Sequence, residues 1–133
     1  MTGKHDKEFE QYQALDLKIA KALQIDVPEL DMPGHVTSWV AAYPHWAPPG
    51  INAVPVAASD RFGGHEACLD PSSGDVLDAV EVLIGELAEI FPDPFVHLGG
   101  DEVNPTWWQQ SESVQRAMRD GGIDSPHALQ AAF

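Results

Sequence analysis

The sequence predicts an α/β fold built on a parallel sheet, and three observations lead to that prediction. Helical and strand-like segments alternate along the 133 residues, as they do where crossover helices join parallel strands. The two strand-like runs, 25–30 (IDVPEL) and 95–100 (FVHLGG), are mostly apolar, as strands buried on both faces are. Both runs lead into acidic residues, and ligands bind at the carboxyl ends of parallel strands.

Four helices are expected around these strands. Residues 6–23 place apolar side chains at steps of three and four. Residues 70–91 form the clearest helix, with Asp70 suited to the N-cap, Pro71 to the first helical position, and prolines just beyond the last apolar residue. The remaining helices are expected at 111–118 and 125–133, each opened by a serine.

The segment 32–71 is predicted to be a long loop, because it holds six of the eleven prolines and has no lasting periodicity. Loops of this length are usually functional or disordered, and the aromatic residues in this one argue against disorder. All four tryptophans are expected in loops, where each either forms a wall for a sugar or packs into the core; we expect packing for any single one. They are Trp39, Trp46, Trp107 and Trp108.

Composition narrows the class of protein. The apolar fraction of 44% allows a packed core. The net charge of −14 repels phosphates and anionic lipid, so we expect neither nucleic acid nor membrane as a partner.

The lone Cys68 excludes an intramolecular disulfide and a cysteine-rich zinc site, and is expected to be a small buried hydrophobe. The first residues lack the apolar core of a signal peptide, but the compartment stays open because a signal could lie upstream.

Asp101 and Glu102 stand side by side just past Gly99 and Gly100. Successive residues of an extended chain point to opposite sides, so both carboxylates face one site only if the backbone bends at the glycines. Two carboxylates held close in a partly desolvated cleft can share one proton, which gives an acid and an anion in one site, as acetal hydrolysis requires. On local sequence alone, a solvated acidic turn explains the pair at least as well.

The motif DMPGH follows the first predicted strand. Its Pro33-Gly34 step marks a turn. The turn brings His35 near the same rim, where an imidazole can relay a proton to a carboxylate; a structural histidine bonded to backbone is the alternative. His97, inside the second strand, is expected to be a satisfied interior histidine.

Metal binding and cofactors are not expected. Six side chains are of types that could supply metal ligands; they are His35, His65, His97, Asp31, Asp101 and Glu102. No pair of these histidines has the tight HxxxH or HExxH spacing of a metal motif.

Three segments, PELDMPGH, CLDPSSGDVLDAVEVLIGELAEIFPDPFVHLGGDEVNPTWW and VQRAMRDGGIDSPHALQAAF, resemble the catalytic barrel of family 20 glycoside hydrolases, the β-N-acetylhexosaminidases. The resemblance runs from about residue 15 to 133. It implies a (β/α)8 TIM barrel, hydrolysis of terminal non-reducing N-acetylhexosamine residues, and glycans that carry these sugars as partners. The two motifs, strand-PGH and HLGGDE, occur in the family's order.

The resemblance also implies roles for three residues. Glu102 matches the general acid/base, and Asp101 matches the carboxylate that orients the substrate's 2-acetamido group, whose carbonyl oxygen is the nucleophile. His35 matches a histidine that sits behind the acid/base residue and couples to its protonation.

Much of the family's barrel has no counterpart in the sequence. A complete barrel has about 250 residues, so the chain corresponds to about two strand-helix units plus following helices, and residues 1–14 match poorly. The family's sugar-gripping arginine and the aspartate that pairs with His35 would lie upstream, and other pocket residues downstream, so no further substrate-binding residue is assigned. We therefore expect residues 1–133 to be a catalytic-domain fragment that needs the missing segments; the alternative is a non-catalytic remnant or weak sugar-binding module.

Overall fold

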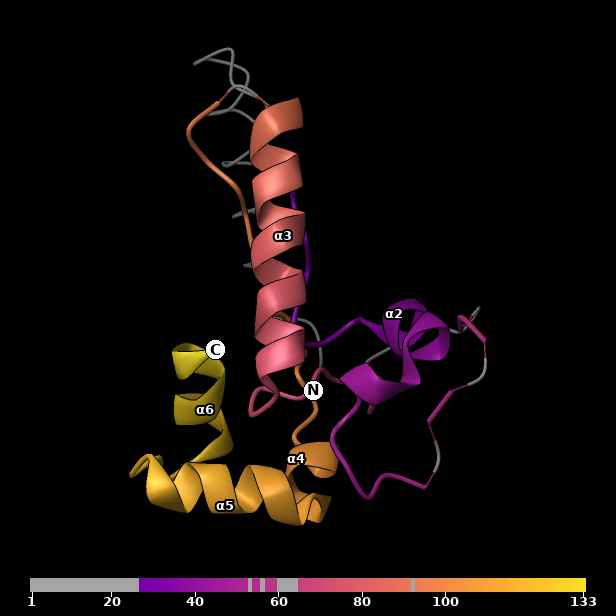
Figure 1. The fold of residues 1–133 in the computed structure, drawn as a ribbon, viewed down its shortest axis with the longest axis vertical. Coiled ribbons are helices and arrows are strands. Elements are labelled where there is room, and N and C mark those ends of the chain that lie inside the picture. Colours follow the sequence, from indigo (N-terminus) through magenta and orange to yellow (C-terminus); the bar gives the residue numbers. More distant parts are fainter. Residues whose placement is uncertain (1–26, 53, 56, 60–64, 92) are drawn as a thin grey trace, which may run out of the picture.

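A computed structural model describes residues 27–52, 54–55, 57–59, 65–91 and 93–133. The helix expected over 6–23 lies outside these residues. Nearly all the regular secondary structure of the described part is helical, and α3 is the longest of the helices (Figure 1). The elements are α2 (Thr37–Ala42), the 3-10 helix η1 (Pro44–Trp46), α3 (Gly74–Ile90), α4 (Thr106–Gln110), α5 (Glu112–Asp120) and α6 (Pro126–Ala132).

The two predicted strands pair in parallel, but only over a single bridge between Glu29 and His97. His97 N donates to Pro28 O at 2.9 Å, and Leu30 N donates to His97 O at 2.9 Å. The next donor, Met32 N, bonds Leu98 O at 3.1 Å, one residue short of the partner that a continuing parallel ladder would use. The parallel direction of the two predicted strands is thus confirmed. Their predicted length is wrong in the described part, because the pairing ends where the second segment turns.

The predicted helix at 70–91 is present, but it begins later than expected. Helix α3 starts at Gly74 with Ser73 at the N-cap. Asp70 does not cap it: its Oδ1 accepts from Ser72 N at 2.9 Å and from Ser72 Oγ at 2.6 Å. An Asx turn of this kind competes with the helical cap for the same carboxylate, so the residues around Pro71 form a turn.

The loop prediction for the tryptophans is wrong, because all four lie in short helices. Trp39 is in α2, Trp46 in η1, and Trp107 and Trp108 in α4. Helices of three to six residues are too short to show a 3.6-residue period in sequence. The packing prediction is confirmed for the two tryptophans of α4, which are 3% and 1% exposed. Trp39 and Trp46 are partly buried against the core, with Tyr43 stacked 4.5 Å from Trp46 between ring centres.

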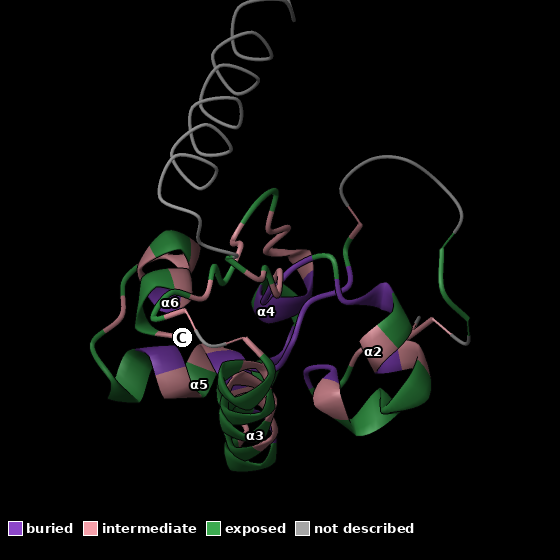
Figure 2. Cartoon of the chain, turned by 90° about the horizontal axis from the view of Figure 1, so that it is seen from above, coloured by how far each residue is buried: buried purple, intermediate pink, exposed green. Residues whose placement is uncertain are grey.

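The core gathers where α4 meets the buried run 67–70, as the burial colours show (Figure 2). Trp108 Nε1 donates to Leu69 O at 2.9 Å, and Leu69 N donates to Pro33 O at 3.0 Å, so this run ties α4 to the DMPGH turn. Cys68 is fully buried, as expected. The buried apolar residues are Met32, Val36, Val40, Ala47, Ala67, Cys68, Leu69, Val76, Trp107, Trp108, Val114, Met118 and Leu129.

The two C-terminal helices begin where the sequence predicts. Helix α5 has Ser111 at its N-cap, and α6 has Ser125, whose Oγ accepts from Ala128 N at 3.2 Å. Leu129 anchors α6 in the core with 6% exposure. Within the part of the chain that the structure describes, no helix has the length and apolar character needed to span a bilayer.

Candidate active site

The DMPGH turn packs directly against the segment that carries the acid pair. A Cβ added at Gly34 would lie 3.3 Å from Asp101 O and 3.4 Å from Val103 Cγ2, so glycine permits this close approach. The next residue, His35, has a φ of +52°, in the left-handed region of the backbone that non-glycine residues rarely adopt. The turn and the acid pair therefore form one site from segments about 70 positions apart.

His35 lies between two carboxylates. Its Nε2 atom is 3.7 Å from Glu102 Oε2 and 3.9 Å from Asp31 Oδ2. The side chains of His35 and Asp31 are 33% and 26% exposed, while that of Glu102 is 65% exposed. The imidazole is therefore less exposed than the Glu102 carboxylate beside it, and their separation is slightly longer than a hydrogen bond.

The backbone of the acid pair is bent as the two glycines permit. Gly99 and Gly100 have φ values of +67° and +103°, and Glu102 has +48°. A Cβ on Gly99 would collide with the Cα and carboxylate of Asp31, so only glycine fits there. Non-glycine residues held at positive φ cost about 1–3 kcal/mol and cluster at functional sites, and this site contains two of them, His35 and Glu102.

Asp101 and Glu102 face different neighbours. The Glu102 carboxylate lies by the imidazole of His35. Carboxylate oxygens of Asp101, Asp31 and Glu29 instead all lie within 4.8 Å of one another. The first-strand and second-strand acids thus meet at one rim, as the sequence predicts. This trio differs from the ligand set that the sequence offered, because Glu29 enters it and no histidine does.

His97 is not the interior residue that the sequence predicts, since its side chain is 56% exposed. Its Nδ1 accepts from Gly99 N at 3.1 Å and lies 3.3 Å from Glu29 Oε1. Nδ1 can accept the Gly99 N–H only while it carries no proton, so that hydrogen bond and an ion pair with Glu29 exclude each other. The imidazole helps to shape the glycine turn from outside the core.

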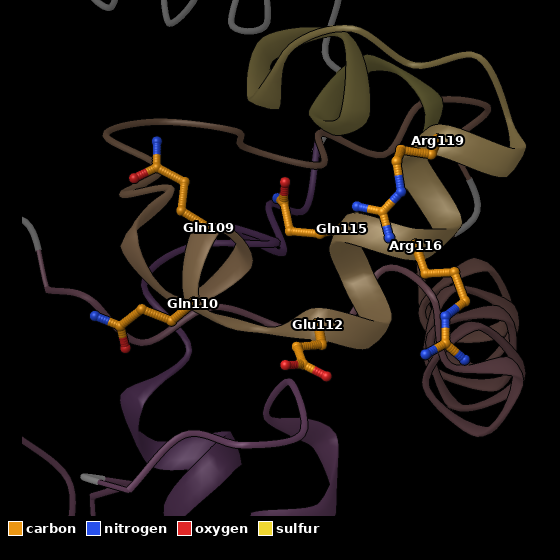
Figure 3. A pocket seen from close by; sticks show the side chains of 6 residues that line it. All are labelled: Gln109, Gln110, Glu112, Gln115, Arg116 and Arg119. Carbon is orange, nitrogen blue, oxygen red and sulfur yellow. The ribbon is translucent and has the colours of Figure 1, made fainter.

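Two hollows on the surface of the described part have linings that include none of His35, Asp101 and Glu102. One, of about 270 Å³, is polar and lies between α4 and α5 (Figure 3). The other, of about 320 Å³, has Trp107 and His65 in its wall. Neither hollow belongs to the acid pair, whose two residues are both exposed.

The side chains at this rim suit acid–base cleavage of a glycosidic bond. Such chemistry needs one carboxyl group that gives and takes a proton at the leaving oxygen and a second carboxylate for the developing positive charge. Glu102 lies 3.7 Å from the imidazole of His35, and Asp101 lies with a separate group of acids, so the two carboxylates have different surroundings.

The chain belongs to glycosyl hydrolase family 20, whose catalytic-domain model matches residues 9–133. It is 31% identical over 105 residues to β-hexosaminidase subunit alpha of Rattus norvegicus, and 32% identical over 109 residues to the β-hexosaminidase of Porphyromonas gingivalis. These alignments cover 79% and 80% of this chain, but 19% and 13% of the relatives.

Solved structures of the family are similar in fold. Flavobacterium johnsoniae chitobiase matches with a TM-score of 0.72 at 28% identity, over 80% of this chain and 16% of that one. The Bacteroides fragilis β-N-acetylhexosaminidase matches with a TM-score of 0.66 at 26% identity, over 80% of this chain and 20% of that one. These family 20 enzymes have a TIM-barrel catalytic domain, and this chain spans a fifth or less of the length of the two solved chains.

Sequence reasoning missed one residue at this site. Gln130 of α6 donates through Nε2 to Gly100 O at 2.8 Å. Glutamine is common on half-buried helix faces, and nothing in its neighbours along the sequence marks this one. Asp31 was expected at the rim, but its contact with the backbone of Gly100, an N–H···Oδ1 bond of 2.8 Å, was not.

Proposed function

We propose that this chain carries the catalytic pair of a β-N-acetylhexosaminidase, an enzyme that removes terminal non-reducing N-acetylhexosamine residues from glycans. The observation that carries the proposal is the 3.7 Å approach of His35 Nε2 to Glu102 Oε2 in a chain of family 20. The printed names of the relatives, β-hexosaminidase and chitobiase, support the same substrate class.

In the proposed mechanism the substrate supplies its own nucleophile. Glu102 protonates the glycosidic oxygen while the carbonyl oxygen of the 2-acetamido group attacks the anomeric carbon from the opposite face. The bond to the leaving alcohol breaks and a cyclic oxazolinium ion forms. Glu102 then removes a proton from water, which opens the ring and restores the acetamide, so the configuration is retained.

Asp101 and His35 would each support one of these events. The Asp101 carboxylate accepts the acetamide N–H and stabilises the positive charge of the oxazolinium ion, which is charge stabilisation specific to the transition state. His35 shares a proton with Glu102, so that the same carboxyl group can act first as an acid and then as a base.

We further propose that the described residues form about two strand-helix units of a (β/α)8 barrel, within residues 1–133 of a longer catalytic domain. The parallel Glu29–His97 bridge supports this arrangement. So do large apolar side chains that stay exposed on α3 and beside the bridge, where further barrel units would cover them. They include Leu77, Val82, Ile90, Phe95 and Leu98.

The test is hydrolysis of a chromogenic β-N-acetylglucosaminide. We expect Glu102→Gln to abolish turnover, while Glu81→Gln, which removes an equal charge from an exposed position on α3, leaves it intact. Asp101→Asn should lower kcat more than it changes KM, because its carboxylate acts on the intermediate.

A non-catalytic remnant is the second candidate, and the openness of the acid pair favours it. Asp101 and Glu102 are both exposed, the Glu102 side chain at 65%. A folded, monodisperse chain that hydrolyses no substrate would establish this candidate for the polypeptide and remove the enzymatic one.

A further inference from the structure

The peptide units on both sides of Gly100 are held by side chains from distant parts of the chain. Gly100 N donates to Asp31 Oδ1 at 2.8 Å, and Gly100 O accepts from Gln130 Nε2 at 2.8 Å. The partners are 69 and 30 positions away in sequence. A Cβ added at Gly100 would lie 3.2 Å from the same Nε2 atom, so the amide of Gln130 rests directly on this glycine.

The contact with Gln130 acts on the peptide plane that leads into the acid pair. The carbonyl of Gly100 and the N–H of Asp101 share one rigid plane. Glycine lets that plane rotate with little steric penalty, and Gly100 adopts a φ of +103°. A donor fixed on Gly100 O therefore sets the direction in which the backbone enters Asp101 and, one residue later, Glu102.

Helix α6 holds the Gln130 side chain in place. Its first turn is capped by Ser125 Oγ, and Leu129, the residue before Gln130, is buried. Gln130 itself is half-buried. Its side chain therefore loses little further conformational entropy when it bonds Gly100. A hydrogen bond with a low entropy cost is effective at holding a neighbouring group in position.

We propose that Gln130 is a positioning residue for the acid pair: through its hydrogen bond to Gly100 O it fixes the peptide plane before Asp101 and so the placement of both carboxylates. The catalytic consequence of this inference rests on the proposed hexosaminidase function. The structural consequence, a change in the Gly100–Asp101 peptide, does not.

Two variants of the full chain remove the donor in different ways. Gln130→Met keeps the length of the side chain without its amide. Gln130→Glu keeps the shape, but an ionised carboxylate only accepts hydrogen bonds and so cannot bond Gly100 O. Ala131→Glu is the matched control, because it adds the same charge at the exposed next position of α6. Circular dichroism checks that each variant has the helix content of the parent.

The first readout is the NMR signal of the peptide itself, the carbonyl ¹³C of Gly100 and the amide ¹⁵N of Asp101. We expect both to move in Gln130→Met and Gln130→Glu and to stay in place in Ala131→Glu. Unchanged signals in the two folded Gln130 variants would overturn the inference, whatever the chain's activity.

The second readout is hydrolysis of the chromogenic β-N-acetylglucosaminide. We expect kcat to fall roughly 10- to 100-fold in both variants, the scale of a small misplacement of catalytic groups, with KM within about threefold. Below about pH 4.3 the introduced carboxylic acid regains a proton and can donate. The ratio of Gln130→Glu to parent activity should therefore rise as the pH falls, while the ratio for Gln130→Met stays flat.

The two proposals fail separately. If the parent chain hydrolyses nothing but the NMR signals move, the function proposal fails for this polypeptide and the positioning role of Gln130 stands. If the parent is active and both Gln130 variants keep its kcat and its peptide signals, the function stands and the positioning role is refuted.

Discussion

Replacing Gly99 by alanine tests the close contact between the two segments that build the site. Gly99 and Gly122 have the same φ of +67°, but their surroundings differ. A Cβ on Gly99 would collide with Asp31, whereas one on Gly122 would meet nothing within 4 Å. Gly122→Ala therefore measures the cost of the left-handed backbone alone, and Gly99→Ala measures that cost plus the collision.

The expected losses follow from these two terms. An L-residue in the left-handed region costs roughly 1–2 kcal/mol, and this applies to both variants. In Gly99→Ala the displaced Asp31 also gives up its hydrogen bond to Gly100 N, and a bond to a charged group is worth about 1.5–3 kcal/mol. The free energy of unfolding should thus fall by about 2.5–5 kcal/mol in Gly99→Ala and by about 1–2 kcal/mol in Gly122→Ala.

Urea unfolding followed by tryptophan fluorescence measures both losses in one assay. Two of the four tryptophans are buried in α4 and report on the core. The contact argument predicts that Gly99→Ala is less stable than Gly122→Ala by at least about 1.5 kcal/mol. Equal losses in the two variants would refute it, because they would mean that the packing of Asp31 against Gly99 contributes nothing.

Five further outcomes are expected. Trp108→Phe leaves Leu69 O without its buried donor and should cost about 1–3 kcal/mol in urea unfolding; a loss below about 0.5 kcal/mol would contradict the bond. Burial, with a smaller contribution from a nearby carboxylate, raises the pKa of Cys68 to about 12, so the folded chain should resist thiol reagents at pH 8, and rapid labelling would contradict it. The folded thiol holds its proton more tightly than the unfolded one, so the protonated thiol favours the folded state. This stabilisation is complete below pH 9 and is lost at about 1.4 kcal/mol per pH unit between pH 9 and about pH 12. The free energy of unfolding of Cys68→Ala should not show this loss. Ser125→Ala removes the cap of α6 and should cost about 0.5–2 kcal/mol, whereas an unchanged midpoint would mean that the cap is not formed. Chelation by EDTA should leave the unfolding midpoint unchanged, because two of the three carboxylates in the trio, Glu29 and Asp101, are exposed, and exposed acidic groups are common without a bound ion; a lowered midpoint would show a bound cation.

Much of the secondary structure was predictable from the sequence, because a long helix shows a clear periodicity and a capping residue marks where a helix begins. The periodicity of 70–91 identified α3, and the serines at 111 and 125 marked the starts of α5 and α6. The short helices were missed because they hold too few residues for a period. The start of α3 was misplaced because Asp70 has two competing local uses, a helix cap and an Asx turn, and the turn prevails.

The sequence by itself determined the chemical types at the rim: two adjacent carboxylates after a glycine pair, and a histidine after a proline-glycine turn. Only the tertiary structure decided how they meet. It set His35 beside Glu102 and turned Asp101 toward Glu29 and Asp31. It also fixed Gly100 between partners 69 and 30 positions away. Such contacts depend on which segments the core brings together. No periodicity or short motif in the sequence indicates that residues so many positions apart will be neighbours in space.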